Sequence, residues 1–147
     1  MDTIHGTSFE FAGIGILVMG DSGAGKSDLA LQMMDRGAAL IADDYTEISA
    51  VDDQLHMRAP KTTEGLMEIR GIGLVKIENR VATSRLGLLV RLIERTEINR
   101  FPEHDYKTFM GQNIAYLQLS IAETSCAAKL AMTCRLLAAG TWPPTSP

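Results

Sequence analysis

The stretch Gly20-Asp21-Ser22-Gly23-Ala24-Gly25-Lys26-Ser27 decides the fold class of this chain, because it matches the phosphate-loop pattern G-x-x-x-x-G-K-[S/T]. Glycines in such a loop let successive backbone N–H groups converge on phosphate oxygens, and the helix that follows adds free N–H groups and partial positive charge. All eight residues are therefore candidate nucleotide-binding residues. Lys26 is expected to reach the β- and γ-phosphates, and Ser27 to offer its hydroxyl to Mg²⁺.

The flanking sequence supplies the strand and the helix that the motif requires. Residues 14–19 are apolar on both sides, as a central strand would be, and they lead into the loop. Residues 27–36 carry apolar side chains at helical spacing, and Gly37 is a C-terminal stop signal. The context therefore predicts a P-loop. The motif alone does not fix a reaction, since motors, switches, small-molecule kinases and regulators share it.

Two acidic residues follow the next buried strand. Residues 38–42 are apolar and end in Asp43-Asp44. A carboxylate at the carboxyl end of a neighbouring strand can lie beside the γ-phosphate and its metal. One aspartate is expected to hold Mg²⁺ directly or through water, and the other to accept a proton from an attacking hydroxyl. The residues themselves do not say which aspartate has which role.

A second motif and one histidine complete the candidate site. Glu68-Ile69-Arg70-Gly71-Ile72-Gly73 follows a predicted strand. Glu68 would add an oxygen ligand to Mg²⁺, and Arg70 would neutralise charge on a transferring phosphoryl group. His5-Gly6 precedes the first predicted strand, where spacing alone favours a surface residue over a functional one.

The remainder of the chain is rich in strand patterns. They predict strands at residues 7–11, 45–51, 54–57, 66–69, 74–77, 86–92 and 114–119. Ser120 and Glu123 form a capping-box pattern that predicts the start of a closing helix. The prediction is an α/β P-loop domain with substantial antiparallel β content and a C-terminal helix. It places a single domain at residues 1–139 and a flexible, Pro-rich tail at residues 140–147.

Composition narrows the classes of protein. The chain has 147 residues, enough for one domain, and its 14 Lys and Arg against 18 Asp and Glu give a net charge of −4, which argues against nucleic acid as the main partner. No apolar run is long enough for a membrane helix and no signal peptide is visible, so we expect a cytoplasmic protein without membrane contact. Cys126 and Cys134 are spaced about two helical turns apart, which predicts buried free thiols.

The combination of motifs resembles the catalytic domain of bacterial HPr kinase/phosphorylase. The resemblance covers roughly residues 4–77, and His5-Gly6 stands where that family has its own His-Gly. The matching residues are 20–27, Ala30, Arg36-Gly37, Leu40-Ile41-Ala42-Asp43-Asp44 and Glu68-Ile69-Arg70-Gly71-Ile72-Gly73. The resemblance implies a P-loop kinase fold related to phosphoenolpyruvate carboxykinase.

The resemblance also implies an activity and a set of roles. The family uses ATP and Mg²⁺ to phosphorylate a serine of HPr, the small carrier protein of the sugar phosphotransferase system, and it is hexameric. Carried over to this chain, Lys26 binds phosphate, and Ser27 and Glu68 hold Mg²⁺. Together with Asp43 they form the expected metal set. An aspartate of the Asp43-Asp44 pair, with Asp44 favoured by the motif, is the base, and Arg70 is catalytic. His5 becomes an active-site residue near the phosphates or the paired carboxylates.

The sequence departs from the family pattern in three places. Full-length members carry an N-terminal domain, and Met1 lies only four residues before His5, so we expect that domain to be absent, as in the short alphaproteobacterial forms. The Pro-Val-Arg-Pro-Gly-Arg-like loop of the phosphorylase step is missing, so only the kinase step is expected. A late catalytic arginine is not placed, with Arg85, Arg91 and Arg100 as candidates. Two other functions stay open: a small-molecule or carboxykinase-like enzyme, and a nucleotide-binding regulatory module without catalysis.

Overall fold

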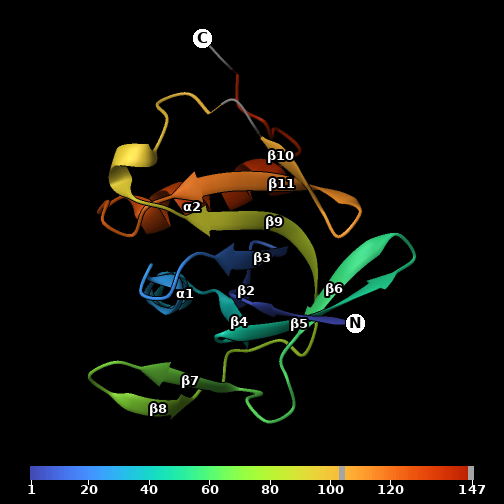
Figure 1. The fold of residues 1–147 in the computed structure, drawn as a ribbon, viewed down its shortest axis with the longest axis vertical. Helices are drawn as coiled ribbons and strands as arrows, with labels where there is room; N and C mark the ends of the chain where they lie inside the picture. Colours follow the sequence, from blue (N-terminus) through green and yellow to red (C-terminus); the bar gives the residue numbers. More distant parts are fainter. Residues whose placement is uncertain (103–104, 146–147) are drawn as a thin grey trace.

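A computed structural model describes residues 1–102 and 105–145 of the chain (Figure 1). Two α-helices accompany a strongly curved sheet within this part. The elements in chain order are β1 Asp2–His5, β2 Thr7–Phe11, β3 Ile14–Met19, α1 Lys26–Asp35, β4 Ala39–Ala42, β5 Tyr45–Val51, β6 Gln54–Arg58, β7 Leu66–Ile69, β8 Gly73–Lys76, β9 Ser84–Leu92, the short 3₁₀ helix η1 Arg95–Glu97, β10 Tyr106–Phe109, β11 Gln112–Leu119 and α2 Cys126–Ala138.

Strand β9 joins the two parts of the main sheet. Its first residues pair with β6, which continues through β5 to β1, and the rest of β9 lies between β3 and β11. β9 is parallel to both β3 and β11, and β2 runs antiparallel to both β3 and β4. Strands β3, β4, β9 and β11 therefore all point the same way. The segments that follow them meet at one edge, where ligands bind in open α/β sheets.

The two faces of β3 bury apolar side chains in different cores. Ile16 and Val18 belong to a cluster that includes residues of α1 and α2, whereas Leu17 belongs to a second cluster with residues of β5 and β6. Both faces are buried because the helices cover one side and the curved sheet folds over the other (Figure 1). This explains the uninterrupted apolar run before the loop, since alternate strand residues point to opposite faces.

Strands β7 and β8 form a two-stranded sheet of their own, separate from the main sheet. In Figure 1 this hairpin lies below α1 and β4. Met67 is buried in the core beside the helices, and Ile69 packs against the same cluster. Ile72 and Leu74 lie at the far end and are 73% and 70% exposed. The hairpin is thus attached by one side and free at its tip.

The closing helix differs from the prediction. It begins at Cys126 rather than at Ser120, because the side chains of the supposed capping box make other bonds. The Ser120 hydroxyl accepts the N–H of Ala122 in a turn, and the Glu123 carboxylate pairs with Lys129 at 2.9 Å. Residues 121–125 are consequently turns. The sequence patterns did not predict β1 and β10, two strands at the edges of the main sheet.

The remaining predictions concern the cysteines, the C-terminal tail and membrane-spanning helices. Cys126 and Cys134 are buried free thiols, as predicted. Trp142 packs against the helix-side core, and its indole N–H donates to the carbonyl of Asp105 at 3.2 Å. The flexible tail at residues 140–147 stays a prediction, and residues 146–147 lie outside the described part. None of the described helices is long and apolar enough to cross a membrane.

Candidate functional site

The loop at residues 20–27 connects β3 to α1 in a conformation that depends on glycine. Gly25 is the N-cap of α1 and has φ +100°, in the left-handed region that L-residues avoid. A Cβ at this position would lie 2.7–2.8 Å from side-chain atoms of Ile121, which follows β11. The loop backbone therefore needs glycine both for its dihedral angle and for its close approach to Ile121.

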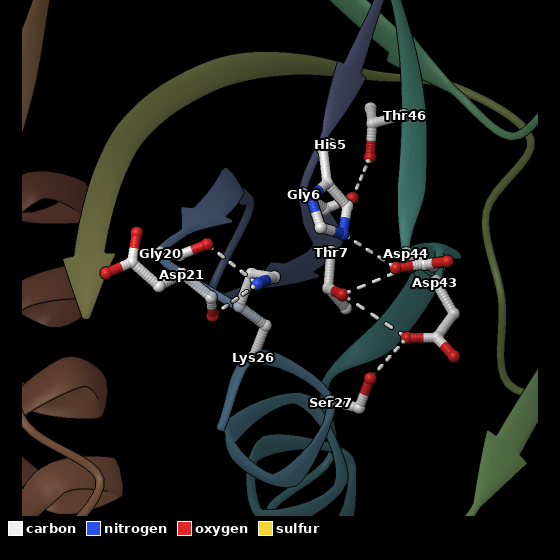
Figure 2. A network of polar contacts seen from close by, with 10 residues as sticks. All are labelled: His5, Gly6, Thr7, Gly20, Asp21, Lys26, Ser27, Asp43, Asp44 and Thr46. Carbon is white, nitrogen blue, oxygen red and sulfur yellow. Dashed lines mark hydrogen bonds and ion pairs between the residues drawn. The ribbon is translucent and has the colours of Figure 1, made fainter. Parts of the chain in front are cut away.

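Lys26 is a buried cation at the centre of this loop, only 7% exposed. Its Nζ donates to the carbonyl oxygens of Gly20 and Asp21 at 2.8 and 3.0 Å (Figure 2). None of the ion pairs among residues 1–102 and 105–145 involves Lys26. A buried charge of this kind is costly unless it is paired, so the loop is poised to accept an anion.

Asp43 follows β4 and receives two hydroxyl hydrogen bonds on one carboxylate oxygen. Ser27 Oγ donates to Asp43 Oδ1 at 2.7 Å, and Thr7 Oγ1 donates to the same atom at 3.2 Å (Figure 2). Asp43 is half-buried and Thr7 fully buried. The start of α1 is thereby tied to the end of β4 through Ser27 and Asp43.

Asp44 is held in a strained backbone conformation beside it. Its φ is +68°, uncommon for a residue with a side chain. The Gly6 N–H donates to the Asp44 carbonyl at 2.8 Å, and the Asp44 N–H donates to Thr7 Oγ1 at 3.2 Å. These bonds hold Asp44 on both sides. Its exposed carboxylate contacts His5, whose Nε2 lies 2.9 Å from Asp44 Oδ1.

His5 in turn is oriented by a ring contact. The imidazole stacks on Tyr45, with ring centroids 5.1 Å apart and an angle of 30° between the rings. His5 ends β1 and Tyr45 begins β5, and the two residues face each other in the pairing of these strands. Strand pairing therefore fixes the direction from which the imidazole reaches Asp44.

These groups surround one open cleft of about 620 Å³. One wall comes from the loop and α1, and the other comes from the β7–β8 hairpin, which contributes Glu68 and Arg70. The predicted site residues that line it are His5, Ser22, Gly23, Gly25, Lys26, Ser27, Asp44, Glu68 and Arg70. Asp43 is linked to the cleft through the hydroxyl of Ser27.

The structure brings the predicted metal set together only in part. Ser27 and Asp43 touch, but none of the described hydrogen bonds joins Glu68 to either of them. In the described residues, no three His, Cys, Asp or Glu side chains gather as a metal site. The expected set contains only two carboxylates, however, and its donors are all oxygens, as Mg²⁺ prefers. The residues would therefore suit a magnesium ion, with phosphate and water supplying its remaining ligands.

Other residues lie away from the cleft. Asp21 and Ala24 line a second hollow on the opposite side of the loop, and so does Arg91. The other two candidate late arginines make different contacts: Arg85 faces His56 in the β6–β9 pairing, and Arg100 lies over the ring of Phe101.

Thr7 is a site residue that sequence reasoning missed. In the sequence it is simply the first residue of a predicted strand, and no motif marks it. Its position between Asp43 and Asp44 results from the pairing of β2 with β4, a contact between segments more than 30 residues apart. A polar residue at the start of a buried strand was the only available signal.

Comparison with known proteins agrees with the geometry. The family model described as HPr Serine kinase C-terminal domain matches residues 1–135. Curated relatives named HPr kinase/phosphorylase include that of Peptoclostridium acidaminophilum, 39% identical over 120 residues, which are 80% of this chain and 38% of the relative. That of Ralstonia nicotianae is 33% identical over 130 residues, 82% of this chain and 40% of the relative. The chain thus spans about two fifths of the length of these relatives.

A solved structure has the same fold. The Hpr(Ser) kinase/phosphatase from Coxiella burnetii superposes with a TM-score of 0.84 and covers 95% of this chain and 98% of its own. The two sequences are only 21% identical. The mixed α/β architecture with a curled sheet and a C-terminal helix is therefore shared at a level where the sequences have largely diverged.

Proposed function

The chain belongs to the family of the HPr serine kinase C-terminal domain, and from this premise we propose that it transfers the γ-phosphoryl group of ATP to a serine hydroxyl of an HPr-type phosphocarrier protein. One observation carries the proposal. A buried ammonium group without a counter-ion in the described residues lies in a glycine-rich loop, and two aspartates follow the nearby strand β4. The relatives named above are enzymes of this type.

Binding of the polyphosphate is the part that the loop performs. Lys26 Nζ now donates to two loop carbonyls, and a β- or γ-phosphate oxygen would give it a charged acceptor instead. Backbone N–H groups of the loop and of the first turn of α1 supply further donors. Phosphoryl transfer passes through a loose transition state, so holding the γ-phosphate in line with the incoming hydroxyl provides most of the catalysis.

The two aspartates are proposed to have different roles. Asp44 faces the open cleft, where a serine hydroxyl of a partner protein can reach it, and we assign it the acceptance of the serine proton. Asp43 is half-buried and bonded to Ser27 and Thr7, so it is suited to hold the loop and a metal ligand rather than to meet a substrate. His5 orients Asp44 through the 2.9 Å contact.

Mg²⁺ would be held by Ser27 and Asp43, with Glu68 contributing from the hairpin. When bound, the ion supplies charge neutralisation for the phosphate oxygens. Arg70 lines the same cleft and is proposed to neutralise charge on the γ-phosphoryl group as it moves. By resemblance we further propose that the protein is a cytoplasmic homohexamer, which sedimentation velocity can measure.

The experiment that tests the function is incubation with labelled ATP, Mg²⁺ and purified HPr, followed by mapping of the phosphorylated residue. We expect a phosphoserine, and we expect Asp44→Asn to abolish its formation. Asp53→Asn is the matched control, because Asp53 is exposed in the β5–β6 turn and also has a positive φ of 61°. Tight ATP binding with no transfer to HPr, while Asp44→Asn changes nothing, would instead favour a regulatory module. Transfer to a small metabolite instead of HPr would favour a small-molecule or carboxykinase-like enzyme.

A further inference from the structure

The turn at residues 43–45, which carries Asp44, is strained. The Tyr45 N–H donates to the Asp43 carbonyl at 2.8 Å, and this bond closes a three-residue γ-turn with Asp44 at its centre. Asp44 has φ +68°, and γ-turns with a positive φ are rare and costly. Such a conformation persists only where the surrounding structure holds it in place. The contacts around this turn therefore determine where the Asp44 carboxylate lies.

Gly6 is the residue that holds the turn from the side of β1 and β2. Its N–H donates to the Asp44 carbonyl at 2.8 Å. Gly6 is buried between the two strands, and a Cβ there would lie 2.9 Å from the Val18 carbonyl oxygen and 3.0 Å from Leu17 Cδ1. The Gly6 peptide is thus pressed against the central strand β3. Any shift of this peptide would move the turn that is bonded to it.

Two buried hydroxyl groups hold Gly6 in turn. Thr46 Oγ1 donates to the Gly6 carbonyl at 3.0 Å (Figure 2). Ser8 Oγ lies 2.9 Å from Thr46 Oγ1. A hydroxyl has one proton, and Thr46 uses its own on Gly6, so Ser8 is the donor in this second contact. Ser8 and Thr46 are both completely buried, and none of the described side-chain hydrogen bonds joins either of them to an aspartate.

The two hydroxyls come from different parts of the sheet. Ser8 lies in β2, which pairs with β3 and β4, whereas Thr46 lies in β5, which pairs with β1 and β6. The register of β2 against β4 shifts between Ser8 and Phe9, next to this contact. Packing alone does not call for the pair, since apolar side chains of similar size fill a core without the cost of burying hydroxyls. What the pair provides is a directional bond from the core to Gly6.

We propose that Ser8 and Thr46 are positioning residues for phosphoryl transfer. Through the Gly6 peptide they hold the strained turn, and they thereby keep the Asp44 carboxylate beside His5 at the cleft. The inference rests on the proposed function, because it takes Asp44 as the group that accepts the serine proton. It adds that the transfer rate depends on two hydroxyls behind the site, whereas ATP binding, which the phosphate loop performs, does not.

Thr46→Val tests the proposal, because valine has nearly the same shape as threonine and lacks the hydroxyl. Gly6 then loses the donor to its carbonyl, and Ser8 loses its acceptor. We expect kcat for transfer to HPr to fall by about tenfold to a hundredfold, since a small displacement of a reacting group has an effect of that size. KM for ATP should be unchanged, because the contacts of Lys26 are not altered. Thr46→Ser, which keeps the hydroxyl, should restore most of kcat.

Thr133→Val is the matched control for the loss of a buried hydroxyl. Thr133 lies in α2, away from the cleft, and its Oγ1 donates to the Lys129 carbonyl at 2.9 Å. Both variants should lose stability, so kcat is expressed per ATP-binding site, counted by calorimetric titration. Thr133→Val should then have the kcat of wild-type protein. An equal fall of kcat in the two variants would show that Thr46 contributes only to stability, and it would overturn the proposal.

Amide hydrogen exchange followed by NMR measures the turn without reference to activity. In Thr46→Val the N–H groups of Gly6 and Tyr45 should exchange faster, because they form the bonds of the turn, while Val18 in β3 keeps its protection. Unchanged exchange at Gly6 and Tyr45 would overturn the proposal. If Thr46→Val does not fold, Ser8→Ala decides: a lower kcat at unchanged KM for ATP supports the proposal, and an unchanged kcat overturns it.

The outcomes separate this inference from the proposed function. Transfer by wild-type protein together with an undiminished kcat in Thr46→Val would overturn the role of the two hydroxyls and leave the kinase proposal standing. Failure of wild-type protein to phosphorylate HPr would overturn the proposed function and this inference with it.

Discussion

The two walls of the cleft are built in different ways. One wall, which we call the cradle, consists of residues 20–27 and the Asp43-Asp44 pair, and it is tied into the main sheet. Lys26 is buried and bonded to two loop carbonyls, and Asp43 is bonded to two hydroxyls. The other wall, the β7–β8 hairpin, pairs only with itself and exposes Glu68 and Arg70.

The side chains of the cradle are therefore fixed before a ligand binds, whereas those of the hairpin are free to adjust to it. Preorganised donors are most effective where charge develops during reaction, and the cradle has that character. A two-stranded hairpin is marginally stable by itself, so this one depends on Met67 and its apolar neighbours in the core. We therefore expect the cradle to determine whether the reaction occurs and the hairpin to modulate it.

The largest effect is expected for Lys26→Ala in the cradle. Removing one positioned electrostatic group lowers a rate by about 10²–10³-fold, and here the group is also the cation that binds the phosphates. The fold should persist, because the hydrogen bonds of the Lys26 ammonium group go to carbonyls of its own loop. Steady-state transfer to HPr measures the loss, with exposed Lys61→Ala as control. Undiminished activity in Lys26→Ala would refute the role of the loop.

Met67→Ala tests whether the hairpin depends on its anchor. Shortening a buried methionine costs about 2–5 kcal/mol, and we expect that cost to appear as local detachment of the hairpin rather than global unfolding. Amide hydrogen exchange should accelerate in β7 and β8 while β3 keeps its protection. Loss of protection throughout the sheet would show that the two walls are not independent. Val75→Ala, at a half-buried residue of β8, provides a smaller truncation for comparison.

Thr7→Val tests the buried hydroxyl that serves both aspartates. The substitution keeps the shape but removes a donor to Asp43 and leaves the Asp44 N–H without its acceptor, which costs about 1–3 kcal/mol. We expect a lower melting temperature together with reduced transfer. Thr7→Ser, which retains the hydroxyl, should recover most of the transfer rate. Equal activity of the Val and Ser variants would remove Thr7 from the positioning of the aspartates.

The smallest effect concerns the two buried thiols of α2. Burial raises the pKa of Cys126 from 9.0 to about 11, with the Glu123 carboxylate adding to the effect, and burial raises that of Cys134 to about 12. Alkylation by iodoacetamide at about pH 8 should therefore be slow in the folded protein and fast in urea. Because the folded state keeps these protons longer, their contribution to stability is complete below pH 9.0 and declines as the pH rises toward 11–12. Rapid labelling of the native protein would contradict the observed burial.

The central α/β unit was predictable because its signals are local. Strand β3, the glycine-rich loop and α1 follow one another in the chain, and each is determined by residue types at short spacing. The same holds for the individual strands of the β5–β6 and β7–β8 hairpins. The capping-box pattern was misleading because Glu123 found a partner in Lys129. A four-residue pattern does not include such competing contacts.

The sequence by itself determined the phosphate loop, the acidic pair and the resemblance that joins them to Glu68 and Arg70, since all of these are contiguous motifs. Only the tertiary structure decided which aspartate faces the cleft, that Thr7 binds both, that His5 reaches Asp44, and that a second hollow opens beyond β9 and β11. These are contacts between segments far apart in the chain. These contacts result from the order of the strands in the sheet and from burial, and no short stretch of residues encodes strand order or burial.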